Sequence, residues 1–120
     1  MHEMTIANAI LSETLHAVAS HGDADTLGVE QVEVAIGELQ LVVSEALDLA
    51  WGAVTEGTPA EGSELVTTDV PPDARCRQCS ERFAPTTREF VCPACGVADA
   101  EILAGNDIVL TSVVCRTQEG

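Results

Sequence analysis

The sequence has no lysine and no long apolar run, and these absences weigh against nucleic-acid binding and against membrane spans. Its net charge is −15, so the phosphate backbone of a nucleic acid would be repelled by such a surface. No apolar stretch approaches the roughly 18 residues that a membrane-spanning helix requires. Residues 1–20 lack the basic region and small-residue cleavage site of a secretory signal. We therefore expect a cytoplasmic protein that binds neither nucleic acid nor membrane.

Aromatic residues are also scarce and are limited to Trp51, Phe83 and Phe90. Since 46% of the 120 residues are nevertheless hydrophobic, the chain can bury a core built from Ala, Val, Leu and Ile. The length suits one domain with a small additional module. The acidity itself fits either solubility or attraction to a basic protein or a cation, and charge alone does not separate these explanations.

Hydrophobic spacing predicts two helices. Residues 3–20 carry apolar side chains three and four positions apart, which is typical of an amphipathic helix. A second helix is expected over 45–56, where Ser44 is a plausible N-cap. Gly57 can end this helix in a left-handed conformation.

Strand patterns follow each helix. Residues 29–39 alternate between apolar and polar side chains, and 63–70 form a second expected strand. A short strand over 100–105 and a longer one over 106–115 come near the end of the chain. A long apolar strand needs a sheet to join, and the simplest sheet is the one formed by the first two strands. The expected fold is therefore α+β, with two helices and a three-stranded sheet.

Four of the five cysteines form two pairs with the spacing C-x2-C, namely Cys76 with Cys79 and Cys92 with Cys95. In an intracellular chain this arrangement favours metal over disulfides. Each pair can form a tight turn that directs two thiolates at one ion, and two such turns make a tetrahedral site. We predict a structural Zn(II), because four sulfur ligands leave no open position for catalysis.

The cysteine-rich segment differs from the rest of the chain and is expected to be an inserted, zinc-ribbon-like module. We place the α/β domain at 1–72 and 104–120 and the zinc domain at 73–103. The alternatives are a redox dithiol and a zinc ribbon that reads single-stranded nucleic acid. The nucleic-acid alternative is suggested by the four arginines in this segment, but the overall acidity of the chain opposes it. Cys115 is interpreted as a small apolar residue on a buried strand.

The first three residues, Met1, His2 and Glu3, offer a second set of metal donors. An α-amino group and an imidazole both titrate near neutral pH, so both are available to a metal there. The amine, the His2 amide nitrogen and the His2 ring can close two adjacent chelate rings, with the Glu3 amide or carboxylate as a fourth donor. Planar nitrogen and oxygen ligands suit Ni(II) or Cu(II). Taken alone, a histidine at this position also fits chance placement.

One known family combines all of these features. The shared elements are "MHE" at the start, "VEVAIGELQLVVSEALDLAW", "EGTPAEGSELVTTDVPPDARCRQC", "CPACG" and "GNDIVLTSVV". Together they resemble the HypA/HybF family of hydrogenase maturation factors, which are nickel metallochaperones. The resemblance covers essentially the whole chain, and the combination of "MHE" with two cysteine pairs is more specific than either part.

The resemblance implies a function and a set of sites. It implies a nickel-binding α/β domain with Ni(II) held as cargo by Met1, His2 and Glu3, and a separate zinc domain that uses the four paired cysteines. The implied partners are a HypB-type nickel GTPase and a [NiFe]-hydrogenase large subunit, and members of the family are not enzymes. The chain is expected to be a monomer or a weak homodimer. The alternative is a zinc-ribbon module that binds protein or RNA without a cargo metal.

Overall fold

The computed structural model describes residues 2–21, 26–86 and 90–117. In chain order the elements are α1 (Glu3–His21), β1 (Thr26–Gly37), the 3-10 helix η1 (Glu38–Gln40), α2 (Ser44–Val54), β2 (Glu64–Val70), β3 (Asp73–Cys76), β4 (Arg82–Phe83), β5 (Ala100–Ala104) and β6 (Ile108–Thr117). The chain forms two compact units, the first comprising Met1–Val34, Val42–Thr68 and Val109–Gly120, and the second Ala35–Leu41 and Asp69–Ile108.

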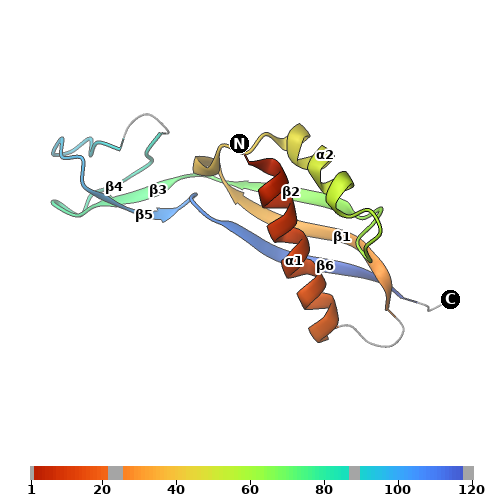
Figure 1. Cartoon of the computed structure of the whole chain (residues 1–120). Coiled ribbons are helices and arrows are strands. Elements are labelled where there is room, and N and C mark those ends of the chain that lie inside the picture. Colours follow the sequence, from red (N-terminus) through yellow and green to blue (C-terminus); the bar gives the residue numbers. More distant parts are fainter. Residues whose placement is uncertain (1, 22–25, 87–89, 118–120) are drawn as a thin grey trace. The chain divides into compact units, whose positions relative to one another are not determined.

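Three strands form one sheet in the order β2-β1-β6 (Figure 1). The last strand thus joins the first two, which confirms the sheet expected from its apolar length. Along β1, Val32 and Val34 are buried whereas the intervening Glu33 is only partly buried, so one face of the strand is covered. Helices α1 and α2 pack against each other, and both contribute buried side chains to the core.

The core of the first unit is aliphatic, with one tryptophan. Apart from Ala60 in the loop after α2, its buried apolar side chains come from α1, β1 and α2, and are Ala7, Ile10, Leu11, Val29, Val32, Val34, Leu47, Ala50 and Trp51. Burying a Val, Leu or Ile side chain contributes about 1.5–3 kcal/mol, so this helix–sheet interface is the main source of stability in the unit. The Trp51 indole satisfies its only donor by bonding to the Ser63 hydroxyl at 3.0 Å.

The ends of α2 differ from the expectation. The prediction that Ser44 is the N-cap is wrong, because Ser44 is already helical and Val43 is the N-cap. The Val43 carbonyl accepts the first helical bond from the Leu47 N–H at 2.9 Å, so the helix starts one residue early. No side chain caps this end. Gly57 is left-handed with φ of 75°, but the helix has already ended at Val54.

The second unit contains a close crossing of backbones. The Gly37 N–H donates to the Asp107 carbonyl at 2.8 Å, and the Leu39 N–H donates to the Gly105 carbonyl at 2.9 Å. A Cβ on Gly37 would lie 2.2 Å from the Gly105 backbone, which no real side chain tolerates. Glycine is therefore required at position 37 for these two segments to pair.

A second, smaller sheet lies in this unit, in the order β4-β3-β5. Strand β3 pairs antiparallel with both neighbours, and its central Ala74 is fully buried. This sheet supports the first cysteine pair, because Cys76 is the last residue of β3. Within the described residues, no helix is both long enough and apolar enough to cross a membrane.

Candidate metal centres

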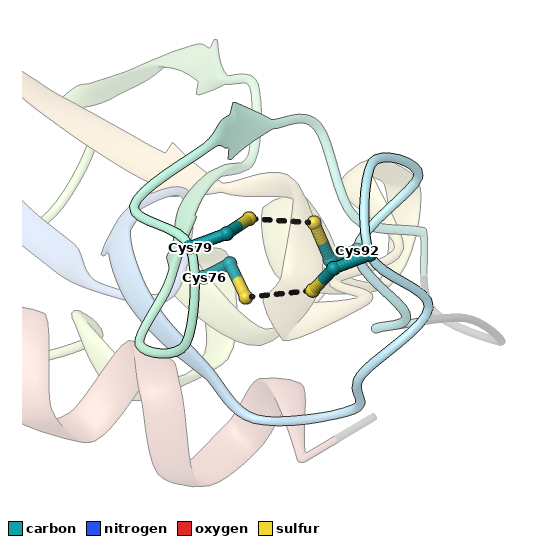
Figure 2. A group of neighbouring side chains, drawn as sticks. Cys76, Cys79 and Cys92 are labelled. Atoms are coloured by element: carbon teal, nitrogen blue, oxygen red, sulfur yellow. Dashed lines mark hydrogen bonds between the residues drawn. The ribbon is translucent and has the colours of Figure 1, made fainter.

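The four paired cysteines converge on one point. Each can direct its Sγ atom so that all four sulfurs lie within 4.8 Å of one another. The Cys76 sulfur lies 3.6 Å from that of Cys95, and the Cys79 sulfur lies 3.6 Å from that of Cys92. Figure 2 shows Cys76 and Cys79 facing Cys92, with these two contacts drawn as dashed lines. All four cysteines are free thiols rather than disulfides.

These distances fit a tetrahedral ion. With Zn–S bonds of about 2.3 Å, the edges of a regular S4 tetrahedron are about 3.8 Å long. The two sulfur–sulfur contacts of 3.6 Å are close to that edge length. Thiolates are soft ligands, and a tetrahedral set of four is typical of Zn(II) or an iron–sulfur centre. Cys76 and Cys92 are buried while Cys79 and Cys95 are exposed, so each pair contributes one inner and one outer ligand.

The two pairs are held by the same backbone turn. In the first, the Cys76 N–H donates to the Glu81 carbonyl at 2.9 Å, and the Ser80 N–H returns a bond to the Cys76 carbonyl at 2.9 Å. In the second, the Cys92 N–H donates to the Val97 carbonyl at 3.1 Å, and the Gly96 N–H returns to Cys92 at 2.8 Å. Each donor and acceptor therefore occurs at the same offset from the first cysteine of its pair.

Backbone N–H groups in these turns also point at the sulfurs. The Cys79 N–H is the largest influence on the Cys76 thiol and lowers its pKa to about 7, assisted by the Gln78 N–H. For Cys79 the Glu81 N–H lowers the pKa, but the neighbouring Cys92 sulfur and burial outweigh it and raise the pKa to about 12. Thiolates held this close together oppose one another's ionisation, which raises the pKa values of Cys79 and Cys95.

The arginines of this unit that the structure describes include two with acidic partners. Arg77 donates to the Asp99 carboxylate at 2.9 Å, and Arg82 donates to the Asp73 carboxylate. Spacing alone could not find these pairs, because the partners come from other strands and turns. They reduce the positive charge that the sequence suggested for this segment. Arg88 lies outside the described residues.

The amino-terminal donors lie in the first unit, at the start of α1. His2 is exposed, and its carbonyl accepts the first helical bond from the Ile6 N–H at 2.9 Å. Glu3 is the first helical residue, and its carboxylate accepts a bond from the Val43 N–H at 3.0 Å. The terminal ammonium group, followed by Val43, lowers the pKa of Glu3 to about 2. Met1 itself lies outside the described residues.

Cys115 lies apart from the four clustered cysteines. It lies on β6 in the first unit and is partly buried, whereas the cluster belongs to the second unit. Phe83 is partly buried and Phe90 is exposed, so the cluster owes little to an aromatic cover.

Comparison with known proteins gives a consistent result. The family described as "Hydrogenase/urease nickel incorporation, metallochaperone, hypA" matches residues 1–115. The chain is 34% identical to the hydrogenase maturation factor HypA of Streptomyces avermitilis over 114 residues, covering 94% of this chain and 86% of that protein. It is also 34% identical to HypA of Desulfosudis oleivorans over 113 residues, covering 94% and 96% of the two chains.

The fold is also similar to a solved structure. The solution structure of the nickel metallochaperone HypA from Helicobacter pylori superposes with a TM-score of 0.71, covering 98% of this chain and 99% of that one. The two sequences are 22% identical, so this likeness bears on the fold alone. It confirms the α+β architecture that the sequence predicted.

Proposed function

The chain belongs to the HypA family of metallochaperones for nickel incorporation and hydrogenase maturation, and from this premise we propose that it carries Ni(II) at its amino terminus. The proposed cargo site consists of Met1, His2 and Glu3. The four clustered cysteines hold a resident Zn(II) that maintains the second unit. The observation that carries the proposal is the exposed His2 at the start of α1, in a different unit from the cysteine cluster.

The chemistry of the amino terminus suits a cargo ion. The first N–H groups of a helix have no intrahelical partner, so the amide nitrogen of His2 is not committed to the helix. Together with the terminal amine and the His2 ring, it offers nitrogen donors in the planar arrangement that Ni(II) favours over Zn(II). The exposure of His2 lets a partner protein reach the ion and remove it.

The chemistry of the cysteine cluster suits a resident ion instead. Four thiolates complete a tetrahedral shell, so a bound Zn(II) has no vacant position through which to exchange. The matching turns around each pair hold the backbone beside the sulfurs with the same two hydrogen bonds. This division supports a role in which zinc maintains the fold and nickel is transferred.

The recipient and partners follow from the family. We propose transfer to a HypB-type nickel GTPase, with a [NiFe]-hydrogenase large subunit as the destination, inside the cytoplasm. The net charge of −15 favours a basic protein surface as partner. The acidic partners of Arg77 and Arg82 speak against the alternative of an RNA-binding zinc ribbon, because those guanidinium groups are already paired.

A nickel titration of the zinc-loaded protein tests the proposal. Calorimetry with Ni(II) should give one site per chain in the native protein, and His2→Ala should remove it because the ring donor is lost. His16→Ala is the matched control, since His16 is also exposed on α1 but lies far from the chain start in sequence. Zinc content and helical signal should stay unchanged in both variants.

Three outcomes would contradict the nickel proposal. If the His2→Ala protein bound nickel as tightly as the native protein, the amino terminus would not be the site. If nickel bound only with loss of zinc, the cysteines would be the true ligands. Absence of any nickel binding by native protein would favour the alternative of an interaction module without cargo.

A further inference from the structure

One contact at the amino terminus joins residues that are far apart in sequence. An oxygen of the Glu3 carboxylate accepts a hydrogen bond from the backbone N–H of Val43 at 3.0 Å, across 40 positions of sequence. Glu3 is the first residue of α1, and Val43 is the N-cap of α2. The contact therefore ties the beginning of one helix to the beginning of the other.

The local backbone explains why the Val43 N–H is available. Leu41 ends η1 in a left-handed conformation with φ of 55°, which is unusual for a side chain of this size. Two residues later, Val43 is extended, with φ of −90° and ψ of 113°, and its carbonyl begins α2. Its N–H precedes the helix and has no role in the helical ladder, so it needs an acceptor from elsewhere. Glu3 supplies that acceptor.

We propose that the Glu3 carboxylate is a positioning group for the nickel site rather than a nickel ligand. Bonded to Val43, it fixes the first turn of α1, and with it the orientation of the adjacent His2. This inference rests on the proposed nickel function and assigns a different role to one of its three residues. A donor set whose supporting group is fixed loses less freedom on binding and holds the ion more tightly.

Four substitutions separate positioning from ligation. Val43→Pro removes the N–H donor but leaves the Glu3 carboxylate intact, and the φ of Val43 is close to the range that proline accepts. Val43→Ala is its control, because it keeps the N–H and the Val43 side chain is 57% exposed. Glu3→Gln keeps a hydrogen-bond acceptor of the same shape but weakens any metal–oxygen bond. Glu3→Ala removes both.

If Glu3 positions, the variants should fall into two groups. Val43→Pro should weaken nickel binding roughly three- to tenfold, since it removes one hydrogen bond to a charged group. Glu3→Ala should weaken it at least as much, because it removes the same bond together with the carboxylate charge beside the terminal ammonium group. In a Glu3→Ala background, Val43→Pro should weaken binding no further, because the acceptor of the Val43 N–H is already gone. Val43→Ala should stay within about twofold of the native affinity. Glu3→Gln should lose less affinity than Glu3→Ala, because its amide oxygen can still accept the bond from the Val43 N–H. The ligand-field absorption of bound Ni(II) should be the same in all of them.

A second measurement needs no nickel. Amide hydrogen exchange at Ile6, whose N–H makes the first helical bond of α1, should be faster in Val43→Pro and Glu3→Ala than in Val43→Ala and Glu3→Gln, in zinc-loaded, nickel-free protein. Exchange in the last turn of α1 serves as the internal reference, and should be equal in all four.

The opposite pattern would overturn the inference. If Glu3→Gln lost as much affinity as Glu3→Ala, or changed the nickel absorption, while Val43→Pro bound normally, the carboxylate would be a ligand. Equal exchange rates at Ile6 in all variants would also count against positioning. These failures are distinct from failure of the nickel proposal itself, which is judged by native protein and His2→Ala alone.

Discussion

The cysteine cluster and the amino terminus present metal donors in opposite ways. The cluster draws four sulfurs from two separate turns, and backbone hydrogen bonds hold each turn at the same positions. The amino terminus draws its proposed donors from adjacent residues at the start of one helix, with His2 exposed. One arrangement surrounds an ion with a complete soft shell, and the other offers nitrogen donors on an accessible surface.

Under the proposed function, this difference would let one small chain assign two metals to two tasks. An ion that maintains a fold needs ligands from distant parts of the chain, since it then links segments that would otherwise separate. An ion that must leave needs ligands whose rearrangement does not unfold the protein. Donors from consecutive residues meet that need, because releasing the metal breaks no long-range link.

The largest expected effect comes from removing one cysteine of the cluster. Cys92→Ala takes away a buried ligand, so stoichiometric zinc and the ordered second unit should both be lost. Structural zinc contributes about 10–16 kcal/mol in zinc-finger peptides, and three sulfurs retain only part of that. Zinc analysis and amide dispersion in NMR spectra measure the two losses.

Cys115→Ala is the matched control, because this cysteine lies on β6 and outside the cluster. It should keep one zinc per chain. Nickel binding through His2 should survive in Cys92→Ala, if the first unit folds on its own core. A Cys92→Ala protein with full zinc content and an unchanged spectrum would contradict the assignment of the cluster as a structural site.

The pH dependence of zinc affinity is the next largest effect. In the metal-free cluster the pKa of Cys76 is lowered to about 7, while that of Cys79 is raised to about 12 and that of Cys95 is also raised. Near neutral pH, Cys79 and Cys95 thus hold protons that zinc must displace. Each displaced proton makes the zinc affinity rise about tenfold per pH unit. Because at least two protons are displaced, the zinc affinity should fall at least about a hundredfold when the pH is lowered by one unit.

Competition with a chelator at several pH values measures this slope. The His2→Ala background keeps the amino terminus from contributing. Calorimetry in two buffers of different ionisation enthalpy counts the released protons independently. The range from roughly pH 6 to pH 8 brackets neutral conditions. If the zinc affinity did not change across this range, the thiolates would already be formed before the metal binds.

Local patterns in the sequence predicted many features of the two metal-binding regions. The features that they did not predict depend on contacts between distant segments. Spacing predicted the helix at the start and the tight turn at each cysteine pair, because both depend on neighbours a few residues away. The meeting of Cys76 and Cys79 with Cys92 and Cys95 was predicted from the four ligands that one tetrahedral ion requires. The Ser44 cap was wrong because Val43 already provides the carbonyl that starts α2.

The contacts between distant segments left no comparable trace. The bond from Val43 to Glu3 involves a backbone N–H, which every residue except proline possesses, so no residue type marks it. The close approach of Gly37 and Gly105 depends on which strands become neighbours. Glycine hints at such an approach but does not name its partner.

The smallest expected effect tests whether the two cysteine turns are equivalent. The residue that follows each pair is left-handed, with φ of 67° at Ser80 and 76° at Gly96. No atom lies within 4 Å of where a Cβ on Gly96 would be, so Gly96→Ala carries only the conformational cost of that backbone. This should lower the stability of the zinc-loaded protein by about 1 kcal/mol.

Ser80→Gly is the reverse substitution in the other turn and should raise stability by up to about 0.5 kcal/mol, since glycine relieves the strain but gives the unfolded chain more freedom. Thermal unfolding with saturating zinc measures both variants. If Gly96→Ala lowers the free energy of unfolding and Ser80→Gly raises it, the left-handed backbone has the same effect in both turns, and both turns contribute to holding the ion. If Ser80→Gly instead destabilised as much as Gly96→Ala, the serine side chain would contribute something that the shared turn geometry does not contain, and the two halves of the cluster would not be interchangeable.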